Sequence, residues 1–147
     1  MTPTLLGRWE TRLLLLGTIG LVITLFFGRL YGDFTTTLAI LGYVIALGFV
    51  WDVLYTLLQK FRWDRDWPPA FQLGAGIVEG ALVWALIGAT ALWAAVGLEG
   101  LPNVDPGLTF GQFLAHYSAV WVTTFLASQG LLRLIFPRWR FRGGQWL

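Results

Sequence analysis

Four long runs of apolar residues, separated by short polar segments, constrain this chain more than any other feature of its sequence. The first run, 13–30, would form about 27 Å of α-helix, close to the hydrocarbon thickness of a bilayer. The other runs extend over about 36–59, 70–97 and 109–136. Because 56% of the residues are hydrophobic and only 12% are charged, the sequence predicts an all-α polytopic membrane protein. We expect four transmembrane helices in one compact bundle, a single domain over 1–147.

Local signals mark the ends of these runs. Asp33 is placed to cap the second helix after a tight turn, and the Pro-Pro pair at 68–69 suits the first turn of the third helix. Thr109 and Gln112 match a capping box at the start of the fourth run, which Pro137 then ends. The short turn before Asp33 predicts that the first two spans form an antiparallel hairpin.

Small residues recur at helix-contact spacing, a pattern that lets helix backbones approach closely in lipid. We expect these stripes to face other helices of the bundle. They are Gly20, Thr24 and Gly28 in the first span, Gly42 and Ala46 in the second, and Gly76 and Gly80 in the third.

The basic residues are divided unequally between the two sides of the predicted bundle. Nine of the ten Lys and Arg residues lie on the side of the chain termini, and Arg29 lies on the other. Because cytoplasmic loops carry an excess of Lys and Arg, this distribution predicts that both termini are cytoplasmic. The nine residues are Arg8, Arg12, Lys60, Arg62, Arg65, Arg133, Arg138, Arg140 and Arg142.

Asp52 and Glu79 are the two carboxylates inside apolar runs, where ionisable side chains are costly and mark functional candidates. Both lie about 13 Å from the cytoplasmic end of their helices, so they are level with each other. If they meet, they could share a proton or a cation and form a binding or relay site. The alternative is a hydrogen-bond network that orients the bundle, with Thr56, Thr123, Thr124, Arg12 or Arg133 as partners. Gln129 is a further intramembrane polar candidate.

His116 is the only histidine and lies in the outer half of the fourth run. One histidine cannot hold a haem between two histidine ligands, but it could be a single axial ligand to a chlorin or haem. The alternative is a hydrogen bond to a neighbouring helix, the commoner role of a lone membrane histidine. The cofactor is therefore left open, and no metal site is predicted.

Basic and aromatic residues alternate after the fourth run and accompany the connection between the second and third runs. They could bind anionic lipid headgroups or the acidic surface of a partner, or they could be ordinary flanking sequence of a cytoplasmic end. Nucleic-acid binding is not expected, because so short a segment beside a membrane offers no groove-reading element. The candidate residues are Trp63, Trp67, Arg138, Trp139, Arg140 and Arg142.

The segments 51–68 (WDVLYTLLQKFRWDRDWP) and 136–147 (FPRWRFRGGQWL) are similar to parts of small, uncharacterised four-helix membrane proteins of bacteria, cyanobacteria included. The resemblance implies a bacterial plasma membrane or a thylakoid membrane. It carries no activity and no site residue.

Enzyme activity is not expected, because the sequence holds no cysteine, no H-E-x-x-H zinc motif, no P-loop and no Gly-rich dinucleotide fingerprint. Two functions fit the chain. The first is a non-catalytic accessory, scaffolding or assembly subunit of a larger membrane complex, such as a pigment or energy-transducing complex, in contact with lipids and other integral subunits. The second is a small homo-oligomeric channel or transporter in which Asp52 and Glu79 supply a proton or cation site.

Overall fold

A computed structural model describes residues 4–63, 68–95, 101–136, 138–143 and 145, and these residues form helices and turns without a strand. Within them, three segments are long and apolar enough to cross a membrane, namely Leu5–Tyr31, Phe34–Lys60 and Pro69–Gly88. The predicted all-helical fold is therefore confirmed, with three helices suited to a bilayer. The fourth span and the cytoplasmic placement of the termini stay predictions, and residues 96–97 of the predicted third run lie outside the described residues.

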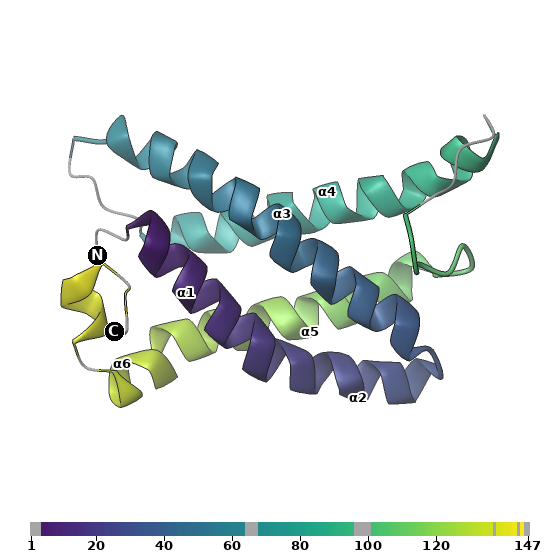
Figure 1. Ribbon diagram of the computed structural model, residues 1–147, viewed down its shortest axis with the longest axis horizontal. Coiled ribbons are helices and arrows are strands. Elements are labelled where there is room, and N and C mark those ends of the chain that lie inside the picture. The colour runs from purple at the N-terminus through teal and green to yellow at the C-terminus, as the bar shows by residue number, and fades with distance from the viewer. Residues whose placement is uncertain (1–3, 64–67, 96–100, 137, 144, 146–147) are drawn as a thin grey trace.

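In the described part of the chain, four long helical segments run back and forth along the long axis of the molecule (Figure 1). One end of the bundle holds Thr4, the end of the helix Phe34–Lys60 and the start of the helix Pro69–Ala95. We call it the terminal end. The elements are α1 (Leu5–Leu15), a π-helical turn (Leu16–Gly20), α2 (Leu21–Tyr31), α3 (Phe34–Lys60), α4 (Pro69–Ala95), α5 (Phe110–Gln129), α6 (Leu131–Ile135) and a 3-10 helix (Trp139–Arg142).

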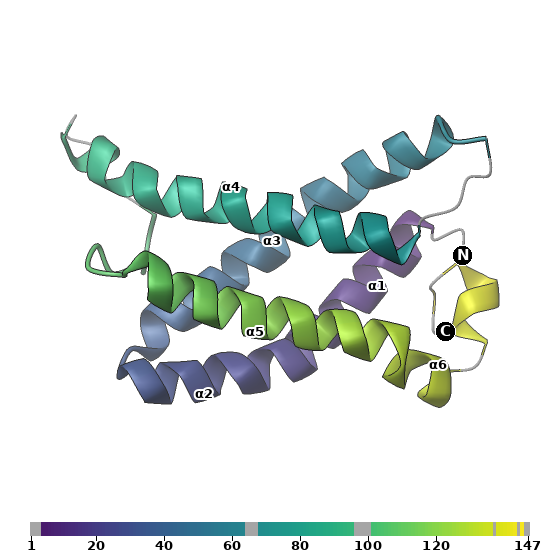
Figure 2. The same ribbon diagram turned by 180° about the vertical axis from the view of Figure 1, so that it is seen from behind.

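The helices form two layers, with α1 and α3 in one and α4 and α5 in the other, as the two opposite views show (Figures 1 and 2). Helix α3 packs against α1, α2 and α4, while α5 packs against α4, α2 and the π-helical turn. Helices α1 and α4 are thus diagonally opposite each other. A side-chain contact between these two helices has to cross the axis of the bundle.

The predicted helix caps are present. The Asp33 carboxylate accepts a hydrogen bond from the Thr36 amide at 2.9 Å and begins α3. Gly32 ends α2 with a φ of 72°, a left-handed conformation that glycine adopts without strain. Thr109 and Gln112 form the reciprocal capping box at the start of α5. These caps depend on residues a few positions apart, so the sequence alone predicts them well.

Helix α1 begins eight residues before the first apolar run, at Leu5. Its N-terminus is capped by Thr4, whose hydroxyl accepts a hydrogen bond from the Gly7 amide at 3.1 Å. Arg8 and Arg12, which the hydropathy pattern places outside the first span, therefore lie within the continuous helical segment Leu5–Tyr31.

The fourth apolar run forms two helices instead of one. Helix α5 ends at Gln129 and α6 begins at Leu131, with Gly130 (φ −110°, ψ −68°) between them. The prediction of one continuous helix over 109–136 is wrong in its last turns.

The small-residue stripes fall into two kinds. Gly20, Thr24 and Gly28 are buried against other helices, and Gly76 and Gly80 contact aromatic rings of α5, as predicted. Gly42 and Ala46 are exposed, and a Cβ at Gly42 would meet no atom within 4 Å. The prediction that this α3 stripe faces the bundle is wrong, since α3 turns a different face inward.

Polar and apolar side chains are distributed in the reverse of the pattern in a water-soluble protein. The buried core holds apolar Ile40, Val83, Ile87, Phe113 and Tyr117, but many polar side chains are also buried, while large apolar side chains cover the outside. The buried polar residues are Thr24, Thr36, Thr37, Asp52, Gln59, Glu79, His116, Thr124 and Ser128. Lipid is the solvent that suits such an exterior, because a hydrocarbon environment accepts apolar groups and not polar ones.

Candidate functional site

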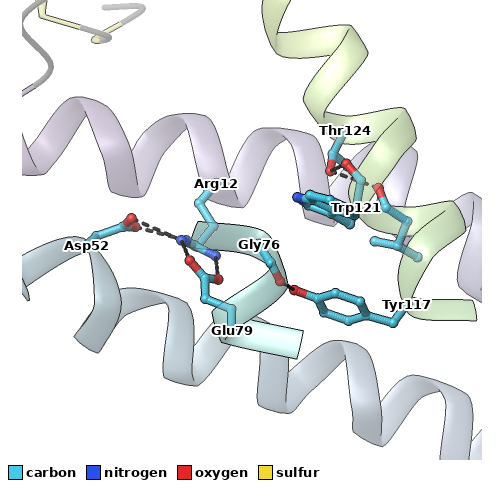
Figure 3. A network of polar contacts seen from close by, with 8 residues as sticks. Arg12, Asp52, Gly76, Glu79, Tyr117, Trp121 and Thr124 are labelled. Carbon is cyan, nitrogen blue, oxygen red and sulfur yellow. Dashed lines mark hydrogen bonds and ion pairs between the residues drawn. The ribbon is translucent and has the colours of Figure 1, made fainter. Parts of the chain in front are cut away.

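Three charged side chains from three helices meet inside the bundle, and we call Arg12, Asp52 and Glu79 the ionic cluster (Figure 3). The Arg12 guanidinium donates to both Asp52 oxygens, from Nε to Oδ2 at 2.9 Å and from Nη2 to Oδ1 at 3.0 Å. It also donates to Glu79, from Nη1 to Oε2 at 3.1 Å and from Nη2 to Oε1 at 3.4 Å. A planar guanidinium with five N–H donors can serve two carboxylates in this way.

The ionic cluster is largely shielded from solvent. Asp52 is 4% exposed and Glu79 is 8% exposed, and the side chain of Arg12 is 16% exposed. Because Arg12 lies on α1 and Glu79 on α4, their ion pair crosses the bundle axis, with Asp52 of α3 beside it. Buried charges such as these are tolerated only when they are paired and hydrogen-bonded. The cluster therefore fixes the relative positions of α1, α3 and α4.

Gly48 provides the space in which the Arg12 guanidinium lies. It is buried one turn before Asp52 on α3, and a Cβ at this position would overlap the guanidinium. Any larger residue would push Arg12 away from its two carboxylates. Glycine at 48 is thus a requirement of the site, and its spacing of four residues from Asp52 places both on one face of α3.

A second arginine lies next to the ionic cluster, on the side of the terminal end. Arg8, one helical turn before Arg12, donates from Nη2 to Oε1 of Gln59 at 2.9 Å. Gln59 is two turns after Asp52 on the antiparallel helix α3. The two arginines of α1 thus face two polar residues of α3 in register. Arg8 also attracts the Asp52 carboxylate electrostatically, so it helps to balance the second negative charge of the cluster.

Aromatic side chains of α5 hold α4 on both sides of Glu79. The Tyr117 hydroxyl donates to the Gly76 carbonyl at 2.6 Å, and its ring lies where a Cβ at Gly80 would be (Figure 3). The Trp121 indole likewise occupies the space beside Gly76. These glycines let α4 and α5 approach closely, so Glu79 is directed away from α5 toward Arg12.

The other polar partners predicted for the carboxylates bond elsewhere. The Thr56 hydroxyl donates to the backbone carbonyl of Asp52 at 2.7 Å, and the Thr124 hydroxyl donates to the carbonyls of Val120 and Trp121. Both threonines thus bond within their own helices. Thr123 is exposed, and the side chain of Arg133 lies outside the described residues.

Gln129 belongs to a separate polar contact between α4 and α5. Its Nε2 donates to Oε1 of Gln72 at 3.1 Å, and Nε2 of Gln72 donates to the hydroxyl of Ser128 at 3.3 Å. Neither of these hydrogen bonds involves a residue of the ionic cluster. It links α4 and α5 near the terminal end.

His116 makes the interhelical hydrogen bond that was one of its two predicted roles. Its Nε2 lies 2.9 Å from the Thr24 hydroxyl, and its ring packs against Phe27 at a centroid distance of 5.4 Å. The residue is 2% exposed, and its Nδ1 has no hydrogen-bond partner among the described residues. Within the described residues, no group of three or more His, Cys, Asp or Glu could hold a metal ion.

The π-helical turn Leu16–Gly20 brings Arg12 and Thr24 to the same side of the first span. In an uninterrupted α-helix, residues twelve positions apart differ in direction by about 120°. A π-turn accommodates one extra residue, which reduces this difference to about 20°. The ionic cluster and the contact of Thr24 with His116 can therefore both lie inside the bundle. Periodicity read from the sequence misses this feature because it assumes one constant helical repeat.

The basic and aromatic candidates lie at the terminal end as far as they are described. Trp63 is 95% exposed, and Arg138 and Arg142 are exposed. Trp67 lies outside the described residues, as do the side chains of Trp139 and Arg140.

Comparisons of the chain with protein-family models, with curated proteins and with solved structures find no match.

Proposed function

We propose that the protein is a non-catalytic accessory, scaffolding or assembly subunit of a larger membrane complex. The observation that carries this proposal is the outer face of α3, where Gly42 and Ala46 are exposed at a spacing that favours close helix packing. A groove of about 440 Å³ continues along this face toward the terminal end. It is lined only by apolar side chains, from Trp9, Phe49, Val50, Val53, Leu54 and Leu57. Such a surface suits a transmembrane helix of another subunit.

The interior of the bundle supports a structural role. Both carboxylates of the ionic cluster are bound by the protein's own Arg12. Beyond the cluster, toward the α2–α3 turn, the axis is filled by the apolar core that contains Ile40, Val83 and Phe113. A polar interior on one side and a packed apolar core on the other fit a rigid bundle better than a conducting pathway.

Helix α5 is proposed as the fourth membrane span. Its polar residues His116 and Tyr117 are buried, whereas Leu114, Val122 and Leu126 are exposed. These two polar groups are thus directed into the bundle. With four spans, the excess of Lys and Arg at the terminal end supports a cytoplasmic location of both termini. We propose a bacterial plasma membrane or a thylakoid membrane as the location.

The test is to extract native membranes carrying a C-terminally tagged chain in a mild detergent and to determine the mass, composition and absorption spectrum of what co-purifies. We expect a hetero-complex that is lost in the variant Gly42→Leu/Ala46→Leu. Gly88→Leu is the matched control, because Gly88 is also exposed with open space around it but lies on α4. Recovery of the unmodified protein only as a free monomer would contradict the proposal.

The second candidate is a small homo-oligomeric channel or transporter. One observation favours it: the ionic cluster holds two carboxylates and one guanidinium, so its second negative charge is offset only from outside the cluster, by Arg8. Asp52→Asn and Glu79→Gln, alone and together, test it by measurement of proton or cation flux in proteoliposomes. Flux that is unchanged in all three variants would eliminate this candidate.

A further inference from the structure

The segment after α6 is tied to the start of α1. The Thr4 amide donates to the Gly143 carbonyl at 2.8 Å, and the Thr4 hydroxyl donates to the same oxygen at 3.3 Å. Nε2 of Gln145 donates to the Thr4 hydroxyl at 3.4 Å. The 3-10 helix therefore lies at the terminal end, beside the start of α1 (Figure 1). These contacts anchor the chain directly after the 3-10 helix.

The 3-10 helix and Arg138, which directly precedes it, present a phenyl ring and two arginine side chains to the surroundings. Phe141 is 87% exposed, and Arg138 and Arg142 are also exposed. The Phe141 amide donates to the Arg138 carbonyl at 3.0 Å, and residues three apart in a 3-10 helix project to the same side. Arg138 and Phe141 thus form one surface in which a cation lies beside an unpacked aromatic ring.

The end of α3 repeats this combination at the same end of the bundle. Lys60 is exposed, and the neighbouring rings of Phe61 and Trp63 are 88% and 95% exposed. Aromatic side chains are favoured at the level of lipid headgroups, where the ring meets the apolar region and nearby cations meet phosphate. Two separate segments thus offer the same chemistry to the membrane surface.

The charge of the two ends differs in sign. Among the described residues at the opposite end, Arg29 is outnumbered by Asp33 and Asp105, whereas by sequence the terminal side carries the other nine basic residues and five acidic ones. A partner of the terminal end should therefore be anionic. Because the exposed rings accompany the cations, the partner should also have an apolar part next to its negative charge.

We propose that the terminal end binds the headgroups of anionic phospholipids, with Arg138 and Arg142 in contact with phosphate and Phe141 in the adjoining apolar region. The assignment rests on the anchored chain after the 3-10 helix, the exposed cations beside exposed rings, and the difference in charge between the two ends. This inference does not depend on the accessory-subunit proposal.

The experiment uses the purified full-length protein in detergent with equal amounts of phosphatidylglycerol and phosphatidylcholine, and native mass spectrometry counts the lipids retained. The unmodified protein should retain mainly phosphatidylglycerol. In Arg138→Gln/Arg142→Gln, the ratio of phosphatidylglycerol to phosphatidylcholine should fall by roughly fivefold for each arginine. Arg29→Gln, which removes a cation at the opposite end, should leave the ratio unchanged.

A further variant separates the ring from the charges. Phe141→Ala keeps both arginines, so it should lower the retention of both lipids and leave their ratio unchanged. An unchanged ratio in Arg138→Gln/Arg142→Gln would overturn the proposal, as would an equal fall in Arg29→Gln, which would indicate a response to total charge. If Arg138→Gln/Arg142→Gln keeps the lipid ratio constant but loses an acidic protein that co-purifies with the unmodified chain from native membranes, the partner is a protein and the lipid assignment is wrong.

Discussion

The first span makes two buried polar contacts, and they differ in charge. Arg12 forms ion pairs with Asp52 and Glu79, whereas Thr24 forms a neutral hydrogen bond with His116. Loss of one partner from the ionic cluster leaves a charge without a counter-ion in a medium of low dielectric. Loss of one partner from the neutral contact leaves only an unsatisfied dipole. The same helix is therefore held by one contact that is costly to break and one that is cheap to break.

The largest effect is expected when Arg12 is replaced. Arg12→Leu should lower the free energy of unfolding by about 3–5 kcal/mol, because two buried carboxylates then lack their cation. Thermal unfolding in nanodiscs measures this loss. Adding Asp52→Asn and Glu79→Gln to Arg12→Leu should restore on the order of 2 kcal/mol, since the buried charges are removed. If the triple variant is no more stable than Arg12→Leu alone, burial of charge is not the cause.

A smaller effect is expected from crowding the guanidinium without removing it. Gly48→Ala should cost about 1–3 kcal/mol, because the new methyl group and Arg12 cannot occupy the same space. Gly88→Ala is the matched control, since a Cβ there meets no atom within 4 Å and alanine favours a helix over glycine. Equal unfolding temperatures for the two variants would contradict the assigned role of Gly48.

The hydrogen bond between Thr24 and His116 should contribute less to the free energy of unfolding than the ion pairs of Arg12. Thr24→Val keeps the shape of the side chain and removes the hydroxyl, so we expect a loss of about 0.6–1.5 kcal/mol. A double-mutant cycle with His116→Phe in the same nanodisc assay isolates the coupling of the pair. A coupling energy as large as that of Arg12 with Asp52 would remove the distinction between charged and neutral contacts.

The smallest effect is expected for a carboxylate outside the spans. Hydrogen bonds from the Thr36 hydroxyl and amide lower the pKa of the Asp33 carboxyl below its ordinary value. Because the folded-state pKa is below the unfolded one, this cap stabilises the fold fully above about pH 4 and is lost as the pH falls through the folded-state pKa. Asp33→Asn should abolish this pH dependence and change the stability at pH 7 by only a few tenths of a kcal/mol, since asparagine also caps helices. Unfolding curves of Asp33→Asn and of the unmodified protein, recorded between pH 3 and 7, test this prediction.

The sequence predicts the parts of this molecule that depend on neighbours along the chain. The caps at Asp33 and Thr109 follow from side chains that reach backbone groups three residues away. The inward direction of Gly76 and Gly80 follows from simple helical spacing. Asp52 and Glu79 were expected at one level, and both bind the same guanidinium.

The parts that were missed depend on how the helices are rotated. Hydropathy placed Arg12 outside the first span, because a window average ends a span at its first charges and ignores a capping residue such as Thr4. The direction of the Gly42 and Ala46 stripe was wrong, because hydropathy gives no preference between two apolar faces of α3. The π-helical turn leaves no signal in a hydropathy average or in a constant helical period.

The ion pair of Arg12 with Glu79 also has a consequence for biosynthesis, because the two residues are 67 positions apart in the chain. At about 5–20 residues per second, the ribosome adds Glu79 roughly 3–13 s after Arg12. Asp52 is added earlier, because it is 40 positions after Arg12, so during the last part of that interval Arg12 has one of its two partners. The ionic cluster is thus completed only when α4 is made, and until then the pair of Arg12 with Asp52 is the part of it that the first hairpin can form.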